Sequence, residues 1–203
     1  MSLSTFVKVG EITNLSDARY CAGMGVELLG FNVVENTSTY VDPEKFEEIV
    51  GWVVGVSYCA ELGHHEPDTA LIDALTKANI AYIESASELF LERLTGFQKI
   101  YKLEVSSENV TDLPGTLKKA GAFADMILIE SEDDTIFARI DDIVQAANHS
   151  IPVIKAYQLD QQSITQLETH NFHGIALKGS EEIKPGYKDF DELAEILEAL
   201  EVD

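Results

Sequence analysis

The chain has 203 residues and a formal net charge of −22, from 36 acidic and 14 basic side chains. This excess of negative charge argues against nucleic-acid backbones and anionic membranes as partners, because both carry charge of the same sign. Hydrophobic residues make up 45% of the chain and charged residues 25%, a composition typical of a folded globular protein.

The length fits a single domain spanning residues 1–203, with enough chain for a core of its own. No apolar run approaches the roughly 20 residues that cross a bilayer, and no basic segment followed by an apolar stretch marks a signal peptide. The two cysteines, Cys21 and Cys59, are too few for a disulfide framework or a four-cysteine zinc site. We therefore expect a cytoplasmic protein.

Short apolar strands alternate with helical stretches along the whole chain. The first strand is predicted at 6–9 and ends in a turn at Gly10 and Glu11; Asn14 or Ser16 can cap the helix that follows. Seven more strands are expected at 28–34, 52–58, 80–84, 98–104, 125–130, 152–155 and 173–178. The helices are expected at 17–24, 43–50, 68–77, 87–94, 116–120, 136–148, 160–170 and 190–200.

This alternation is typical of α/β proteins, in which parallel strands are joined by right-handed helical crossovers. Eight units in one domain of this length predict a closed (β/α)8 barrel, the TIM-barrel fold. An open doubly wound sheet is the alternative. It would more naturally carry a glycine-rich dinucleotide-binding turn after the first strand, and the sequence has none there.

Polar residues stand at the ends of the predicted strands, where barrels of this kind build their active sites. They are Glu11, Asn32, Tyr58, Glu84, Glu104, Glu130, Lys155 and Lys178. Carboxylates and lysines around one rim can form an acid–base set. The same pattern also fits strand ends that only meet water, with the lysines balancing charge.

Segments near both ends of the chain resemble the phosphoribosylanthranilate isomerase family. Residues 7–18 read VKVGEITNLSDA and lead into a Leu-Gly-Phe strand, and residues 38–44 read STYVDPE, similar to the family's second loop. Residues 179–189 read GSEEIKPGYKD, similar to its last loop. The resemblance implies a TIM barrel of tryptophan biosynthesis. It also implies an Amadori rearrangement, in which an acid and a base convert a phosphorylated aminoaldose into an aminoketose.

The resemblance also nominates catalytic residues. The family's base is a cysteine at the end of the first strand; here that position is Gly10, followed by Glu11, so Glu11 becomes the candidate base. The family's acid is an aspartate ending the sixth strand, which corresponds to Glu130. Neither a cofactor nor a metal is implied.

For the phosphate, the family uses glycine turns after the seventh and eighth strands, where backbone N–H groups can approach an anion. The corresponding strand ends here nominate Lys155, Lys178, Gly179 and Ser180. The acidic run 130–134 stands where a glycine-rich loop is expected and would repel phosphate.

We therefore expect an enzyme resembling this isomerase, with a small, phosphorylated substrate, no nucleic-acid or membrane partner, and a monomeric or homodimeric state. The alternatives are a barrel with a different small-molecule substrate and a non-catalytic relative that binds a metabolite. His64 and His65, near Glu61 and Glu66, are residue types that bind metals. A solvated polar loop explains them as well, so we predict no metal site.

Overall fold

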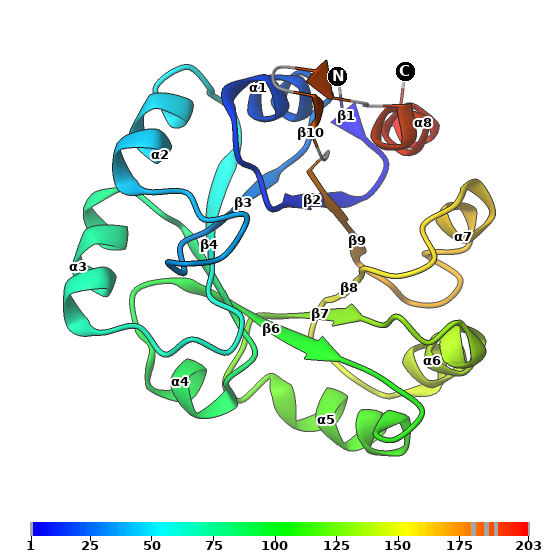
Figure 1. Ribbon diagram of the computed structural model, residues 1–203. Coiled ribbons are helices and arrows are strands. Elements are labelled where there is room, and N and C mark those ends of the chain that lie inside the picture. The colour runs from blue at the N-terminus through cyan, green and yellow to red at the C-terminus, as the bar shows by residue number, and fades with distance from the viewer. Residues whose placement is uncertain (1, 180–181, 185–186, 189–190, 203) are drawn as a thin grey trace.

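Eight parallel strands close into a barrel with helices packed around it, as the computed structural model shows (Figure 1). The structure describes residues 2–179, 182–184, 187–188 and 191–202. In barrel order the strands are β2 (Phe6–Gly10), β3 (Leu28–Asn32), β4 (Ser57–Glu61), β5 (Tyr82–Ser85), β6 (Gln98–Glu104), β7 (Met126–Glu130), β8 (Val153–Lys155) and β9 (Gly174–Lys178). Parallel pairing of β9 with β2 closes the ring. The predicted (β/α)8 barrel is confirmed, and the open sheet is excluded.

The helices follow the strands in turn. They are α1 (Leu15–Gly23), α2 (Pro43–Val50), α3 (Thr69–Lys77), α4 (Glu88–Arg93), α5 (Leu113–Ala120), α6 (Phe137–Ala146), α7 (Gln161–Thr165) and α8 (Asp191–Ala199), with 3-10 turns η1 (Val110–Asp112) and η2 (Asp134–Ile136). Two small antiparallel pairs complete the chain: β1 (Ser2–Leu3) with β12 (Glu201–Val202), and β10 (Glu182–Lys184) with β11 (Tyr187–Lys188). In the described part of the chain, no helix combines the length and apolar character needed to span a membrane.

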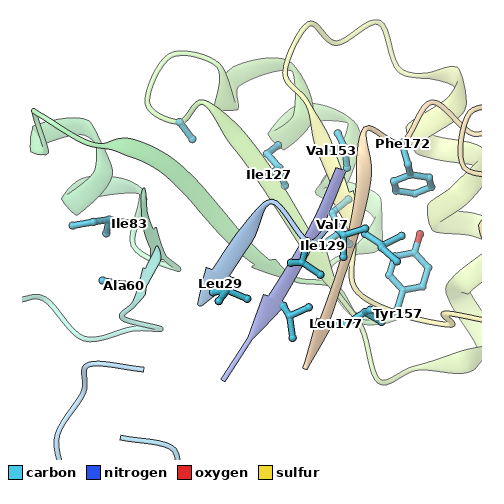
Figure 2. Packing of buried hydrophobic residues seen from close by; sticks show 14 of the residues in the cluster. Val7, Leu29, Ala60, Ile83, Ile127, Ile129, Val153, Tyr157, Phe172 and Leu177 are labelled. Atoms are coloured by element: carbon cyan, nitrogen blue, oxygen red, sulfur yellow. The ribbon is translucent and has the colours of Figure 1, made fainter. Parts of the chain in front are cut away.

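Alternation along the strands divides the side chains between two apolar layers. Val7 and Val9 are buried in the layer between strands and helices. Figure 2 shows Val7 there together with Leu29 and Ile129. A smaller cluster fills the inside of the barrel; its buried members are Leu28, Cys59, Ile100, Leu128, Ile154 and Ala176. Lys8, between two outward valines, points into the barrel instead. The inner cluster closes the barrel below the polar residues of its mouth.

Local sequence signals account for the helix starts. The Asn14 side chain accepts a hydrogen bond from the Asp17 N–H at 3.0 Å and caps α1, one of the two caps predicted. Helix α5 begins at Leu113, earlier than expected, because Pro114 lies in the first turn, where its missing N–H has no helical partner to lose. Helix α7 ends at Thr165 and is shorter than predicted.

The third strand lies further along the chain than predicted. Trp52 and Val54, expected inside it, are 73% and 87% exposed in the segment after α2. The strand begins at Ser57 and ends at Glu61, in register with β3. Tyr58 therefore does not reach the barrel mouth; its hydroxyl donates to the Val53 carbonyl oxygen at 2.8 Å. Glu61 takes the strand-end position instead.

Candidate functional site

A cavity of about 900 Å³ opens at the carboxyl ends of the barrel strands. This is the end at which (β/α)8 enzymes place their active sites. Eight of the polar and charged side chains that line it come from seven strands and the turn after β2: Lys8, Glu11, Asn32, Glu61, Glu84, Lys102, Glu130 and Lys178. Sequence reasoning nominated three of these as site residues, Glu11, Glu130 and Lys178, and the structure brings the three together.

Lys178 joins the two predicted catalytic carboxylates at the rim. Its Nζ lies 3.3 Å from Glu11 Oε1 and 3.1 Å from Glu130 Oε1. Lys102, from inside the barrel, contacts the other oxygen of Glu130 at 2.8 Å. Glu11 and Glu130 thus face one another across a single ammonium group.

The two lysines decide the ionisation of Glu130. Its partial burial favours the neutral acid, but the contacts with Lys102 and Lys178 outweigh burial and lower its pKa below the ordinary value. For Lys178 the effects have the opposite sign. Burial alone would lower the pKa of its ammonium, but Glu130 and Glu11 raise it above the ordinary value. Glu130 is therefore held as a carboxylate, a form that accepts protons.

The turn that carries Glu11 has a restricted backbone. Glu11 has a φ of 55°, in the left-handed region that side chains other than glycine rarely adopt. Its N–H donates to Glu61 Oε2 at 3.0 Å, so the turn is tied to the inside of the barrel. Gly179 packs against it: its N–H donates to the Gly10 carbonyl oxygen at 2.8 Å, and a Cβ there would lie 3.1 Å from the Glu11 carbonyl oxygen.

A buried charged cluster forms the floor of the cavity. Lys8, Glu61 and Glu84 are 2%, 8% and 3% exposed. The Lys8 ammonium contacts Glu61 Oε1 and lies 2.9 Å from Glu84 Oε2. Burial opposes the charge on Lys8, but the two glutamates raise its pKa well above the ordinary value. One ammonium therefore serves two carboxyl groups.

Two glycines make room for Glu61. Gly10 is the last residue of β2 and Gly30 is the middle residue of β3, and a Cβ built on either would overlap Glu61 Oε1. Gly10 stands where the resemblance places a catalytic cysteine, so the space beside that position is filled by a carboxylate from another strand. The absence of two side chains is what admits this glutamate.

Lys155 lies away from the mouth, contrary to the expectation that it faces a phosphate. It is buried in the layer outside the barrel, where its Nζ contacts both carboxylate oxygens of Asp141 on α6, at 2.7 and 3.0 Å. The Tyr157 hydroxyl donates to the same carboxylate at 2.7 Å, and the ammonium lies 4.4 Å from the Tyr157 ring centroid. The lysine joins a strand to a helix.

Of the other predicted phosphate ligands, Gly179 lines the cavity but has its N–H engaged by Gly10, and Ser180 lies outside the described residues. His64 and His65 line the mouth. Within the part of the chain that the structure describes, no three His, Cys, Asp or Glu side chains are grouped to hold a metal ion.

Sequence reasoning missed most of the inner charges. Lys8 carried a signal, because a lysine between two valines of a buried strand must point into the barrel. Glu61 was missed because the third strand was predicted to end at Tyr58. Glu84 was placed at a strand end but was not named as a site residue, and Lys102 lay within a strand with no turn to mark it.

The fold matches solved phosphoribosylanthranilate isomerases over nearly its whole length. The Thermotoga maritima enzyme has a TM-score of 0.76 at 18% identity, covering 97% of this chain and 98% of that one. The Thermus thermophilus enzyme has a TM-score of 0.75 at 17% identity, covering 96% and 98%. The chain has the fold of phosphoribosylanthranilate isomerase. The resemblance predicted from the sequence is confirmed at this level.

A third similar structure is a phosphoribosylanthranilate isomerase in complex with reduced 1-(o-carboxyphenylamino)-1-deoxyribulose 5-phosphate, with a TM-score of 0.72 at 19% identity over 97% of this chain and 98% of that one. No protein-family model and no curated protein matches the sequence. At these identities the likeness establishes the fold, and the chemistry has to be argued from the residues in the mouth.

Proposed function

We propose that the protein is an aldose–ketose isomerase resembling phosphoribosylanthranilate isomerase, which acts on a phosphorylated aminosugar by an Amadori rearrangement. The observation that carries this proposal is the arrangement at the rim. Two carboxylates, Glu11 and Glu130, lie on either side of the Lys178 ammonium at the mouth of a cavity of about 900 Å³. The shared fold supports the reaction class.

The reaction needs a base that removes the proton from carbon 2 and an acid that protonates the ring oxygen as the sugar opens. The sequence suggested Glu11 as base and Glu130 as acid. Because its lysine contacts lower the pKa of Glu130, this residue enters the reaction as a carboxylate and suits the role of base better than that of acid. Glu11, on the other side of Lys178, is the second candidate base.

Lys178 is the residue we propose for the phosphate. Its side chain is 64% exposed, so its ion pairs are solvated and contribute little stability. An incoming phosphate can therefore bind the Lys178 ammonium in place of the glutamates with little loss of stability. The glycine N–H groups used by the family are not required in this arrangement, since a lysine binds phosphate as a point charge.

A second candidate function is a different small-molecule reaction on the same barrel, with a neutral or cationic ligand. The charge of the mouth favours it. Lys8, Lys102 and Lys178 all contact glutamates, and the acidic segment from Glu130 to Asp134 begins at the rim. Four glutamates against three lysines leave the lining short of positive charge for a dianion.

The test is turnover of phosphoribosylanthranilate by the purified protein, followed by the change in anthranilate fluorescence. The proposal expects conversion above a protein-free blank, reduced at least about 100-fold in Glu130→Gln because general base catalysis is lost. No conversion, combined with a thermal shift induced by unphosphorylated aminosugars but not by phosphorylated ones, would favour the second candidate.

A further inference from the structure

The buried cluster at the cavity floor contains one carboxyl group more than is needed to neutralise the Lys8 ammonium. Glu61 and Glu84 are register partners on neighbouring strands, and both contact Lys8. One glutamate would neutralise the lysine. A second buried carboxylate beside the first is unfavourable, because like charges repel and burial removes their hydration. Such a surplus is typical of a site that handles protons.

The two glutamates differ in their hydrogen bonds. Glu61 accepts a hydrogen bond from the Lys8 ammonium at one oxygen and from the Glu11 N–H at the other. Glu84 shares the same ammonium at 2.9 Å and lies deeper. Burial raises the pKa of Glu84; Lys8 opposes this rise and the charge of Glu61 adds to it. Glu84 is therefore a buried carboxyl group that its surroundings shift toward the protonated form.

Charged and titratable groups face Glu84 from the neighbouring strands β4 (Glu61 and Cys59) and β6 (Lys102), and from β2 across the barrel interior (Lys8). Burial raises the pKa of the Cys59 thiol well above its ordinary value, so the thiol is neutral. The balance at Glu84 is set by the two lysines against Glu61 and burial. Removing Glu61 leaves the lysines opposed by burial alone.

We propose that Glu84 is the general acid of this cavity and that Glu61 is a positioning residue that keeps it protonated. Both line the cavity that Glu130 also lines, so an acid and a base face the same space. The inference rests on the proposed isomerase function and supplies the acid that the rim lacks. The buried charges at the cavity floor thereby gain a role in the reaction, which Glu11, Glu130 and Lys178 at the rim do not give them.

The proton transfers balance. The O–H bond of Glu84 breaks and its proton passes to the ring oxygen, which keeps the electrons of the breaking bond to carbon 1. The substrate nitrogen then forms a double bond to carbon 1. Glu130 removes the proton from carbon 2, whose electrons neutralise the nitrogen and form an enol. Glu130 returns its proton to carbon 1, the enol hydroxyl gives its proton to Glu84, and both groups are restored.

The experiment measures kcat, KM and the pH–rate profile of the wild type, Glu84→Gln, Glu61→Gln and the exposed control Glu104→Gln. Thermal unfolding checks the fold of each variant, and both inner variants still pair Lys8 with one glutamate. We expect Glu84→Gln to lower kcat at least about 100-fold with KM nearly unchanged, as loss of a general acid does. Glu104→Gln should behave as the wild type.

Glu61→Gln gives the more specific readout. Without the neighbouring negative charge Glu84 loses its proton at lower pH, so the alkaline limb of the profile should move to lower pH while activity on the acid side is kept. Two results would contradict this inference and leave the proposed function standing. One is a kcat of Glu84→Gln within about threefold of the wild type. The other is an alkaline limb of Glu61→Gln that stays in place or moves to higher pH. An inactive wild type would contradict the proposed function and this inference with it.

Discussion

The carboxylate of Glu61 occupies the space that a side chain on Gly10 would fill. The two residues belong to strands that are not neighbours in the barrel, β4 and β2, yet each determines what the other position can hold. Lys8, which is on the same strand as Gly10, completes the arrangement by binding the Glu61 carboxylate. The floor of the cavity is therefore one coupled unit, and substitutions within it should not act independently.

Gly10→Ala should lower the free energy of unfolding by about 1–3 kcal/mol, because the added methyl group overpacks against Glu61. Gly115→Ala is the matched control: nothing lies within 4 Å of its Cβ position in α5, so a gain of about 0.5–1 kcal/mol is expected there. Urea denaturation measures both. Adding Glu61→Ala should reduce the penalty of Gly10→Ala, and strictly additive effects would contradict the overlap.

Lys8→Met should destabilise the protein by roughly 3–5 kcal/mol near neutral pH, because it leaves Glu61 and Glu84 buried without an ammonium. The loss should shrink in acid, where the carboxyl groups are protonated. Lys178→Met, at a pair of exposed contacts, should change stability by at most about 1 kcal/mol. Equal effects of the two substitutions in urea denaturation would show that the Lys8 cluster is hydrated rather than buried.

Asp141→Asn should weaken the fold without weakening ligand binding. The change removes the charge that pairs with buried Lys155, and breaking a buried pair costs roughly 3–5 kcal/mol. The Lys155–Asp141 pair lies between β8 and α6, and neither residue lines the cavity, so ligand binding should be kept. Thermal unfolding with and without ligand separates the two quantities. If the folded Asp141→Asn variant showed no ligand-induced rise in melting temperature, this would indicate that Lys155 contributes to ligand binding.

The stability of the wild type should depend on pH through Glu84. Its folded-state pKa is raised, so its contribution is fully present below the unfolded value of about 4.3 and is lost as pH rises through the folded pKa. Glu84→Gln removes this dependence, and its stability relative to the wild type should therefore increase over that window. Urea midpoints measured across the window test this. A difference that stays constant with pH would mean that Glu84 titrates normally.

Much of the fold follows from local signals. Strand 98–104 and helix 43–50 were predicted with their observed bounds, because alternation, Pro43 at a helix start and flanking turn residues mark them clearly. The third strand was misplaced because the run from Trp52 to Val56 has strand-like residues but ends before β4 begins at Ser57. Its true position is set by pairing with β3, which no local pattern reveals.

The candidate site also has a part that local sequence signals predict and a part that they do not. Glu11, Glu130 and Lys178 follow from strand ends and the barrel rule. The direction of Lys155 does not, because β8 has three residues, all buried, and a strand buried on both faces shows no alternation. The coupling of Glu61 to Gly10 depends on side chains meeting across the barrel interior, which requires the closed structure itself.

The claim that the mouth at Lys178 binds a phosphorylated aminosugar is tested most directly by calorimetric titration with reduced 1-(o-carboxyphenylamino)-1-deoxyribulose 5-phosphate. We predict binding to the wild type and to the folded control Lys155→Met with similar Kd values. We predict affinity at least about tenfold weaker in Lys178→Met, equivalent to 1.4 kcal/mol of lost interaction. Absence of binding to the wild type, or equal affinity in Lys178→Met, would contradict the account.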